Sequence, residues 1–66
     1  MPDYAPELKR FLRQSGCTLV RPGRGDHEIW LSPVNGRKFV VDHKILSRHT
    51  ANGVLKQAGL ADRKRF

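Results

Sequence analysis

The dipeptide Asn35-Gly36 is the feature that most constrains how this chain folds. It joins two short segments, 28–31 and 37–41, that are rich in aliphatic and aromatic residues. Asn-Gly is the pair favoured in two-residue type I′ turns, because both of its residues tolerate positive φ angles. The sequence therefore predicts an antiparallel hairpin with a type I′ turn at its tip.

A third strand is predicted before the hairpin. Residues 17–20 are β-branched or apolar, which favours a strand. The basic segment 21–25 follows, and its Pro and Gly content predicts that the strand ends before it and that a flexible loop begins. The three segments together predict a three-stranded antiparallel sheet.

An amphipathic helix is predicted ahead of the strands. Over residues 4–15 the apolar side chains recur at i, i+4, i+7 and i+8, which places them on one face of a helix. Asp3 is the expected N-cap, and Gly16 is expected to end the helix in a left-handed conformation.

A second, short helix is predicted after the connector 42–49. We expect Thr50 to be its N-cap and Gly59 to end it, with apolar residues at helical spacing between them. Gly53 inside it indicates either close packing against a neighbour or a weak helix. The charged tail 61–66 is expected to be frayed.

The order helix, strand, strand, strand, helix predicts an α+β fold over a single domain, residues 1–66. Two helices would cover one face of the sheet and leave the other face open. This α-β-β-β-α order is that of double-stranded-RNA-binding domains, although topology alone does not define function. The expected core residues are Phe11, Leu12, Trp30, Phe39 and Leu55.

The chain is strongly basic, with 13 Lys and Arg against 6 Asp and Glu and a net charge of +7. Such an imbalance favours polyanionic partners, nucleic acid in particular. The alternative is a solvated basic face with no partner. The candidate RNA-binding residues cluster around the predicted loop and hairpin and are Arg21, Arg24, Arg37, Lys38 and Lys44.

The cysteine and apolar content predict a cytoplasmic protein without a membrane segment. Cys17 is the one cysteine and cannot form an internal disulfide, which is typical of reducing compartments. Uninterrupted apolar stretches reach only 3 residues, far from the roughly 20 that cross a bilayer. One Cys and 3 scattered His give no zinc-ligand spacing, so we expect no metal and no cofactor.

Four stretches of the chain resemble the HicA-type (YcfA-like) toxins of bacterial and archaeal toxin–antitoxin pairs. They are SGCTLVRPGRGDH (15–27), SPVNGR (32–37), His43, and TANGVLKQAGL (50–60). The resemblance covers nearly the whole chain, from Leu8 to Leu60. Three positions depart from the family pattern: Cys17 replaces an aromatic residue, Asp26 replaces a Ser, and Glu28 replaces a second His.

The resemblance implies a small ribonuclease that cuts messenger RNA, with His27 as its essential histidine. It also implies a HicB-type antitoxin partner. A histidine can take the proton from the 2′-hydroxyl or give one to the leaving 5′-oxygen near neutral pH, with no metal. We therefore expect His27 to act as general acid or base, with His43 as the candidate second group and Lys38 as a candidate charge stabiliser.

Two other functions remain open at this point. Residue chemistry without the resemblance favours an ordinary surface histidine at position 27 and a structural or loop histidine at position 43. A non-catalytic double-stranded-RNA-binding module would need the same fold and charge but no histidine. A degenerate toxin, in which Asp26 and Glu28 repel phosphate, would bind only its antitoxin.

Overall fold

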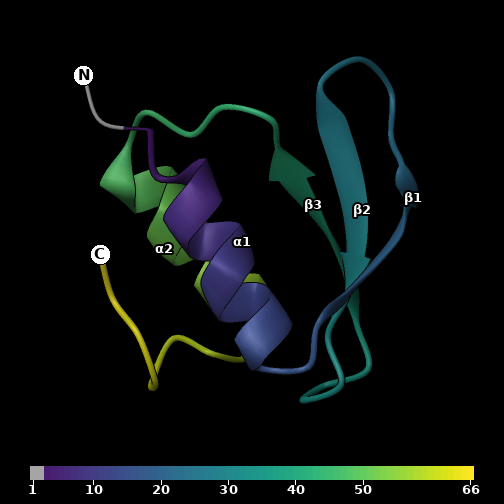
Figure 1. The fold of residues 1–66 in the computed structure, drawn as a ribbon. Helices are drawn as coiled ribbons and strands as arrows, with labels where there is room; N and C mark the ends of the chain where they lie inside the picture. Colours follow the sequence, from purple (N-terminus) through teal and green to yellow (C-terminus); the bar gives the residue numbers. More distant parts are fainter. Residues whose placement is uncertain (1–2) are drawn as a thin grey trace.

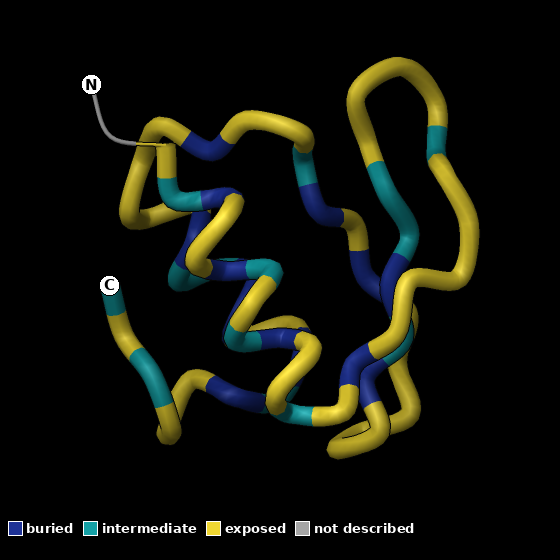
Figure 2. The backbone as a smooth tube through the Cα atoms, viewed as in Figure 1, coloured by how far each residue is buried: buried dark blue, intermediate teal, exposed yellow. Residues whose placement is uncertain are grey.

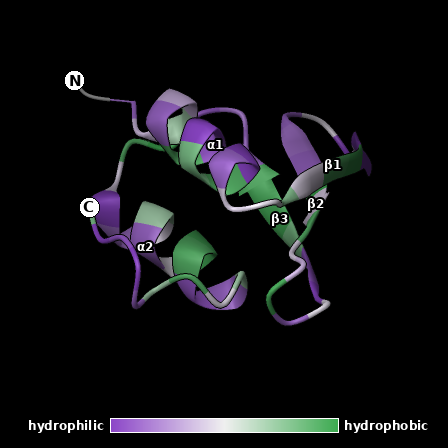
Figure 3. Cartoon of the chain, turned by 60° about the horizontal axis from the view of Figure 1, so that its bottom comes forward, coloured by the Kyte–Doolittle hydropathy of each residue, from purple (hydrophilic) through white to green (hydrophobic). Residues whose placement is uncertain are grey.

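The computed structural model describes residues 3–66 and confirms the α-β-β-β-α order (Figure 1). The three strands form an antiparallel sheet in the order β1-β2-β3. Both helices lie on the same side of this sheet (Figures 1 and 3). The elements are α1 (Ala5–Gln14), β1 (Thr18–Pro22), β2 (His27–Leu31), β3 (Lys38–Asp42) and α2 (Arg48–Gln57).

The core lies between the sheet and the two helices (Figure 2). Trp30 is 0% exposed at the centre of the sheet, and the guanidinium of Arg13 from α1 lies 5.3 Å from its ring centroid. The predicted core residues Leu12, Phe39 and Leu55 are buried, whereas Phe11 packs partly buried at the edge. The helices thus bury one face of the sheet and leave the other face to solvent.

The register of β2 against β3 decides which side chains share a face. Trp30 pairs with Phe39, and these two side chains face the core. Because side chains alternate along a strand, the residues on either side of Trp30 point to the open face. The cross-strand pairs on the open face are His27 with Asp42, Ile29 with Val40, and Leu31 with Lys38.

The predicted type I′ turn is wrong, although the hairpin itself is confirmed. Such a turn needs positive φ at both central residues, and among residues 3–66 only glycines have positive φ, Gly36 with φ 69°. The connection is instead a loop from residue 32 to residue 37, closed by a 2.9 Å hydrogen bond from Ser32 N–H to the Arg37 carbonyl. Asn35 donates its side-chain amide to the Gln57 carbonyl (2.9 Å) and accepts from Arg37 N–H (3.0 Å).

The first strand was predicted to stop before Arg21, but β1 continues through Pro22. Pro22 is compatible with a strand here because β1 lies at an edge of the sheet, where the missing N–H breaks no ladder. The pairing with β2 shifts between Leu19 and Arg21, which marks a β-bulge. Edge position and bulge are both tertiary features that local composition does not reveal.

The N-cap of α1 is Tyr4, and the prediction of Asp3 as the N-cap is wrong, although the Asp3 side chain contacts the start of the helix. Its Oδ1 accepts hydrogen bonds of 3.0 Å from Ala5 N–H and from Ile45 N–H. The Ile45 hydrogen bond, followed by the Ala5 hydrogen bond, lowers the pKa of Asp3. Asp3 therefore ties the first residue of α1 to the connector after β3.

The N-cap of α2 is Ser47, and the prediction of Thr50 is wrong. Ser47 has an extended backbone and its hydroxyl accepts from His49 N–H at 3.2 Å. The first turn carries Arg48 and His49, which add no apolar periodicity and so conceal the true start. Gly59, with φ 76°, ends α2 as predicted.

The tail differs from the frayed segment that we expected. Asn52 of α2 accepts from Phe66 N–H at 2.7 Å and donates to the Phe66 carbonyl at 3.3 Å. The rings of Tyr4 and Phe66 meet edge-to-face, with centroids 5.4 Å apart. The tail is thereby fastened to α2 and to the residue that precedes α1, by contacts between residues far apart in the sequence.

We expect Gly53→Ala to stabilise the protein by about 0.5–1 kcal/mol, because Ala loses less backbone entropy than Gly in a helix. A Cβ at position 53 would meet nothing within 4 Å, so close packing does not explain this glycine. The measurement is urea unfolding followed by circular dichroism.

Gly59→Ala is the control for this prediction. It places a Cβ 3.2 Å from Val34 Cγ1 on a backbone with φ 76°, and it should destabilise by more than about 1 kcal/mol. Equal midpoints for the wild type and Gly53→Ala would contradict the stabilisation that we expect.

Candidate active site

A histidine and a carboxylate meet on the open face of the sheet. His27 begins β2 and Asp42 ends β3, and His27 Nδ1 lies 2.5 Å from Asp42 Oδ1. Their side chains are 53% and 43% exposed, so solvent and ligands reach both. A hydrogen bond to an ionised carboxylate requires the proton on Nδ1, because such a carboxylate can only accept, and Nε2 is then the other ring nitrogen.

The His27–Asp42 pair borders a shallow hollow of about 280 Å³. The hollow lies where the loop between β1 and β2 meets the chain that leaves β3. It is lined by Arg24, Gly25, Asp26, His27, Asp42, His43 and Lys44. Four predicted site residues are thus brought together: the two histidines and two of the five basic residues.

The walls of this hollow are fastened to each other through the backbone. His43 N–H donates to the Asp26 carbonyl at 2.7 Å, which joins the chain after β3 to the loop. Gly23 N–H donates to the His27 carbonyl at 2.7 Å. A Cβ at position 23 would lie 3.2 Å from His27 Cβ, so glycine permits this close approach.

The other predicted RNA-binding residues lie outside the hollow. Arg21 of β1 pairs with Ile29 of β2. Lys38, at the far end of β3, pairs with Leu31 of β2. Arg37 precedes Lys38 in the hairpin loop. Four strand positions separate Lys38 from Asp42, which corresponds to roughly 14 Å. The predicted basic residues are therefore spread along the sheet rather than gathered at the hollow.

Glu28 faces the core side of the sheet and not the hollow. Its Oε1 accepts from Trp30 Nε1 at 3.2 Å and lies 3.0 Å from Lys9 Nζ of α1. The hydrogen bond from Lys9 lowers the pKa of Glu28. Of the two acids that depart from the family pattern, only Asp26 lines the hollow.

Asp42 is the site residue that the sequence did not predict. A two-residue turn at Asn35-Gly36 would set His27 opposite Lys44, whereas the observed register sets it opposite Asp42. The longer loop shifts the pairing of β3 with β2 by two residues. Because this shift is even, the same side chains of β3 still face the core. The one available signal, an acid at the end of a strand, is too common to identify a partner for His27.

Two further observations concern metals and membranes. Within residues 3–66, no three His, Cys, Asp or Glu side chains gather closely enough to hold a metal ion. Neither helix in this part of the chain is long and apolar enough to cross a membrane.

The fold and the site define a small, basic α+β domain with an exposed His–Asp pair at the end of a hairpin. A family model described as the HicA toxin of bacterial toxin–antitoxin matches residues 5–60. The chain therefore belongs to the HicA family and is a toxin of a toxin–antitoxin system, which implies a cognate antitoxin. No curated protein and no solved structure matches it significantly.

The lowered pKa of Glu28 predicts how its contact with Lys9 depends on pH. A carboxyl group whose pKa is lower in the folded state stabilises the protein above its unfolded pKa, near 4.3, and loses this contribution as pH falls through the folded pKa. We expect Glu28→Gln to cost about 0.5–1 kcal/mol at pH 7 and almost nothing at the lowest pH. Urea midpoints between pH 7 and pH 3 measure the difference.

Asp62→Asn is a matched control, because Asp62 is exposed and takes part in none of the ion pairs among the described residues. Its midpoints should follow those of the wild type. A gap between the wild type and Glu28→Gln that stays constant across this pH range would show that the carboxylate charge is irrelevant.

Proposed function

We propose that this chain is a metal-independent endoribonuclease that cleaves messenger RNA and thereby inhibits translation and growth. The observation that carries the proposal is the hydrogen bond between His27 and Asp42 on an exposed surface, beside a hollow that Arg24 and Lys44 also line. A carboxylate that holds Nδ1 orients the imidazole and selects the tautomer in which Nε2 can take a proton.

The reaction needs one base and one acid. The base removes the proton of the 2′-hydroxyl, and O2′ then forms a bond to the adjacent phosphorus while the bond from phosphorus to O5′ breaks. The acid protonates the leaving O5′, so the products are a 2′,3′-cyclic phosphate and a 5′-hydroxyl. No step requires a metal, an oxidant or a further reactant.

His27 takes one of these roles and His43 takes the other. The support is that both histidines line the same hollow and that Asp42 already holds His27. Arg24 and Lys44 line this hollow as well and stabilise the charge on the reacting phosphate. Asp42 acts through His27 and is a positioning residue.

The three basic residues outside the hollow bind flanking phosphates of the RNA. Arg21 and Lys38 point to the open face, and Arg37 neighbours Lys38. Because Lys38 lies at the far end of β3, it contacts a phosphate other than the one that reacts. Contacts of this kind supply affinity without sequence information.

The partner in this proposal is a HicB-type antitoxin that covers the open face and meets the +7 chain with an acidic surface. The support is membership of the HicA family together with the sign of the charge. Since messenger RNA is the substrate, the proposed place of action is the cytoplasm.

We expect the purified chain to cleave a long RNA in EDTA and His27→Ala to lose roughly 10²-fold to 10⁴-fold in rate, the usual contribution of a general acid or base. Asp42→Ala should lose at least about tenfold, because the imidazole is no longer held in one tautomer. Cleavage is measured on gels, and circular dichroism verifies folding.

A second measurement on the Asp42→Ala protein distinguishes a positioning role of Asp42 from a purely structural role. The ¹⁵N and ¹H signals of His27 report its tautomer, and they should show Nδ1–H in the wild type but not in Asp42→Ala. Undiminished cleavage by folded His27→Ala would refute the assignment. RNA binding without cleavage by the wild type favours the double-stranded-RNA-binding module, and antitoxin binding without either favours the degenerate toxin.

A further inference from the structure

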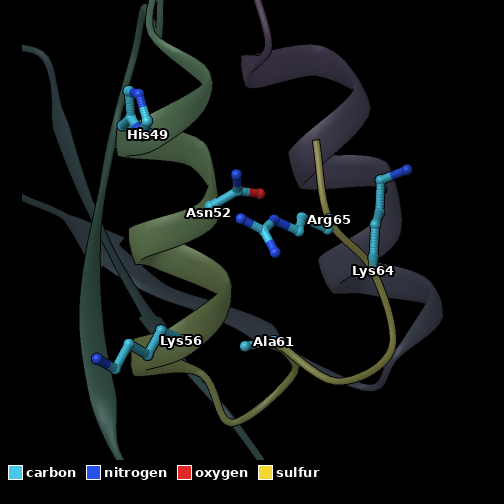
Figure 4. A pocket seen from close by; sticks show the side chains of 6 residues that line it. All are labelled: His49, Asn52, Lys56, Ala61, Lys64 and Arg65. Carbon is cyan, nitrogen blue, oxygen red and sulfur yellow. The ribbon is translucent and has the colours of Figure 1, made fainter.

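A second hollow, of about 250 Å³, lies between α2 and the segment that follows it (Figure 4). It is lined by His49, Asn52, Lys56, Ala61, Lys64 and Arg65. None of these residues lines the hollow at His27. These two hollows are therefore separate: one lies at the ends of β2 and β3 and the other in the helix layer.

The lining of the second hollow is cationic. It holds two lysines, one arginine and one histidine, and no acidic side chain lines it. Lys64 is already engaged, with its Nζ 3.4 Å from Glu7 Oε2 and 4.8 Å from the centroid of the Phe66 ring. None of the ion pairs within residues 3–66 includes Arg65 or Lys56, so the charge of these two remains available to a ligand.

Arg65 occupies the centre of the hollow. Figure 4 shows its guanidinium pointing into the space beside Asn52, while the Lys64 side chain points away from that space. His49, Asn52 and Lys56 follow each other at i, i+3 and i+7 along α2, so they form one face of the helix behind Arg65.

The backbone around Arg65 is held in place. The next residue, Phe66, makes two hydrogen bonds to the Asn52 side chain, of 2.7 and 3.3 Å. The preceding residue, Lys64, donates its N–H to the Leu60 carbonyl at 3.3 Å. Arg65 is thus carried on an ordered backbone against a helix, which lowers the entropy lost when a ligand binds.

We propose that this hollow is a second phosphate-binding site, which holds the backbone of the RNA substrate away from the hollow at His27. The guanidinium fork of Arg65 matches a phosphate, and Lys56 adds a point charge. The volume of about 250 Å³ is enough to take a phosphate group. This inference rests on the proposed function for the identity of the ligand as RNA.

The test compares Arg65→Gln with Arg63→Gln, both made in the His27→Ala protein so that RNA stays intact. Arg63 is exposed, lies in the same segment and does not line the hollow. Both variants remove one positive charge, so they change the net charge equally. The probe is a labelled single-stranded RNA longer than the 32 Å extent of the molecule, followed by fluorescence anisotropy.

We expect Arg65→Gln to weaken RNA binding about fourfold at 0.15 M salt and to reduce the slope of log K against log salt by about 0.7, the share of one phosphate contact. Arg63→Gln should change the affinity less than twofold. Equal losses in the two variants, or no loss in either, would overturn the second site.

Inorganic phosphate provides an independent measurement by NMR. It should shift the backbone amide signals of Arg65 and Lys56 in the wild type but not those of Lys56 in Arg65→Gln, while the signals at His27 respond alike in both proteins. No shift at Arg65 in the wild type would overturn the site. A wild type that binds RNA and phosphate here but never cleaves RNA would overturn the proposed nuclease function and leave the second site standing.

Discussion

The hydrogen bond from the buried Ser32 hydroxyl to the Ala58 carbonyl, 2.6 Å long, is the contact on which the rest of the structure depends. It ties the end of β2 to the end of α2, and the Asn35 side chain adds a second tie to the Gln57 carbonyl at 2.9 Å. These bonds hold the loop from residue 32 to 37, which sets the register of β3. A buried hydroxyl left without its partner would cost about 1–3 kcal/mol, so the register is strongly specified.

That register divides stability and chemistry between the two faces of one hairpin. On the inner face Trp30 pairs with Phe39, and the neighbouring Glu28 contacts Lys9 of α1. On the outer face the same two strands bring His27 and Asp42 together. Because side chains alternate, Glu28, next to His27 in the sequence, lies on the other side of the sheet. The acid that contacts the histidine, Asp42, comes from the other strand.

Most of the fold could be predicted from the sequence because it is encoded in local patterns. Helical periodicity marks α1, and glycine marks the ends of both helices, at Gly16 and Gly59. The type of turn at Asn35 and the true length of β1 could not be predicted. Both depend on neighbours distant in the sequence. The Asn35 side chain donates a hydrogen bond to the Gln57 carbonyl at the end of α2, and β1 tolerates Pro22 only because it is an edge strand.

The sequence by itself determined the order of elements, the basic charge, the family resemblance and the choice of His27 as the candidate catalytic histidine. Tertiary structure decided what surrounds that histidine: Asp42 lies at its Nδ1 and His43 lines the same hollow. It also placed Lys38 away from the histidine, at the far end of β3. It also decided that the tail would pack against α2 and that Arg65 would line a second hollow. The physical reason is that periodicity and capping act over a few residues, whereas strand register and tail docking are settled by contacts that only the folded chain can make.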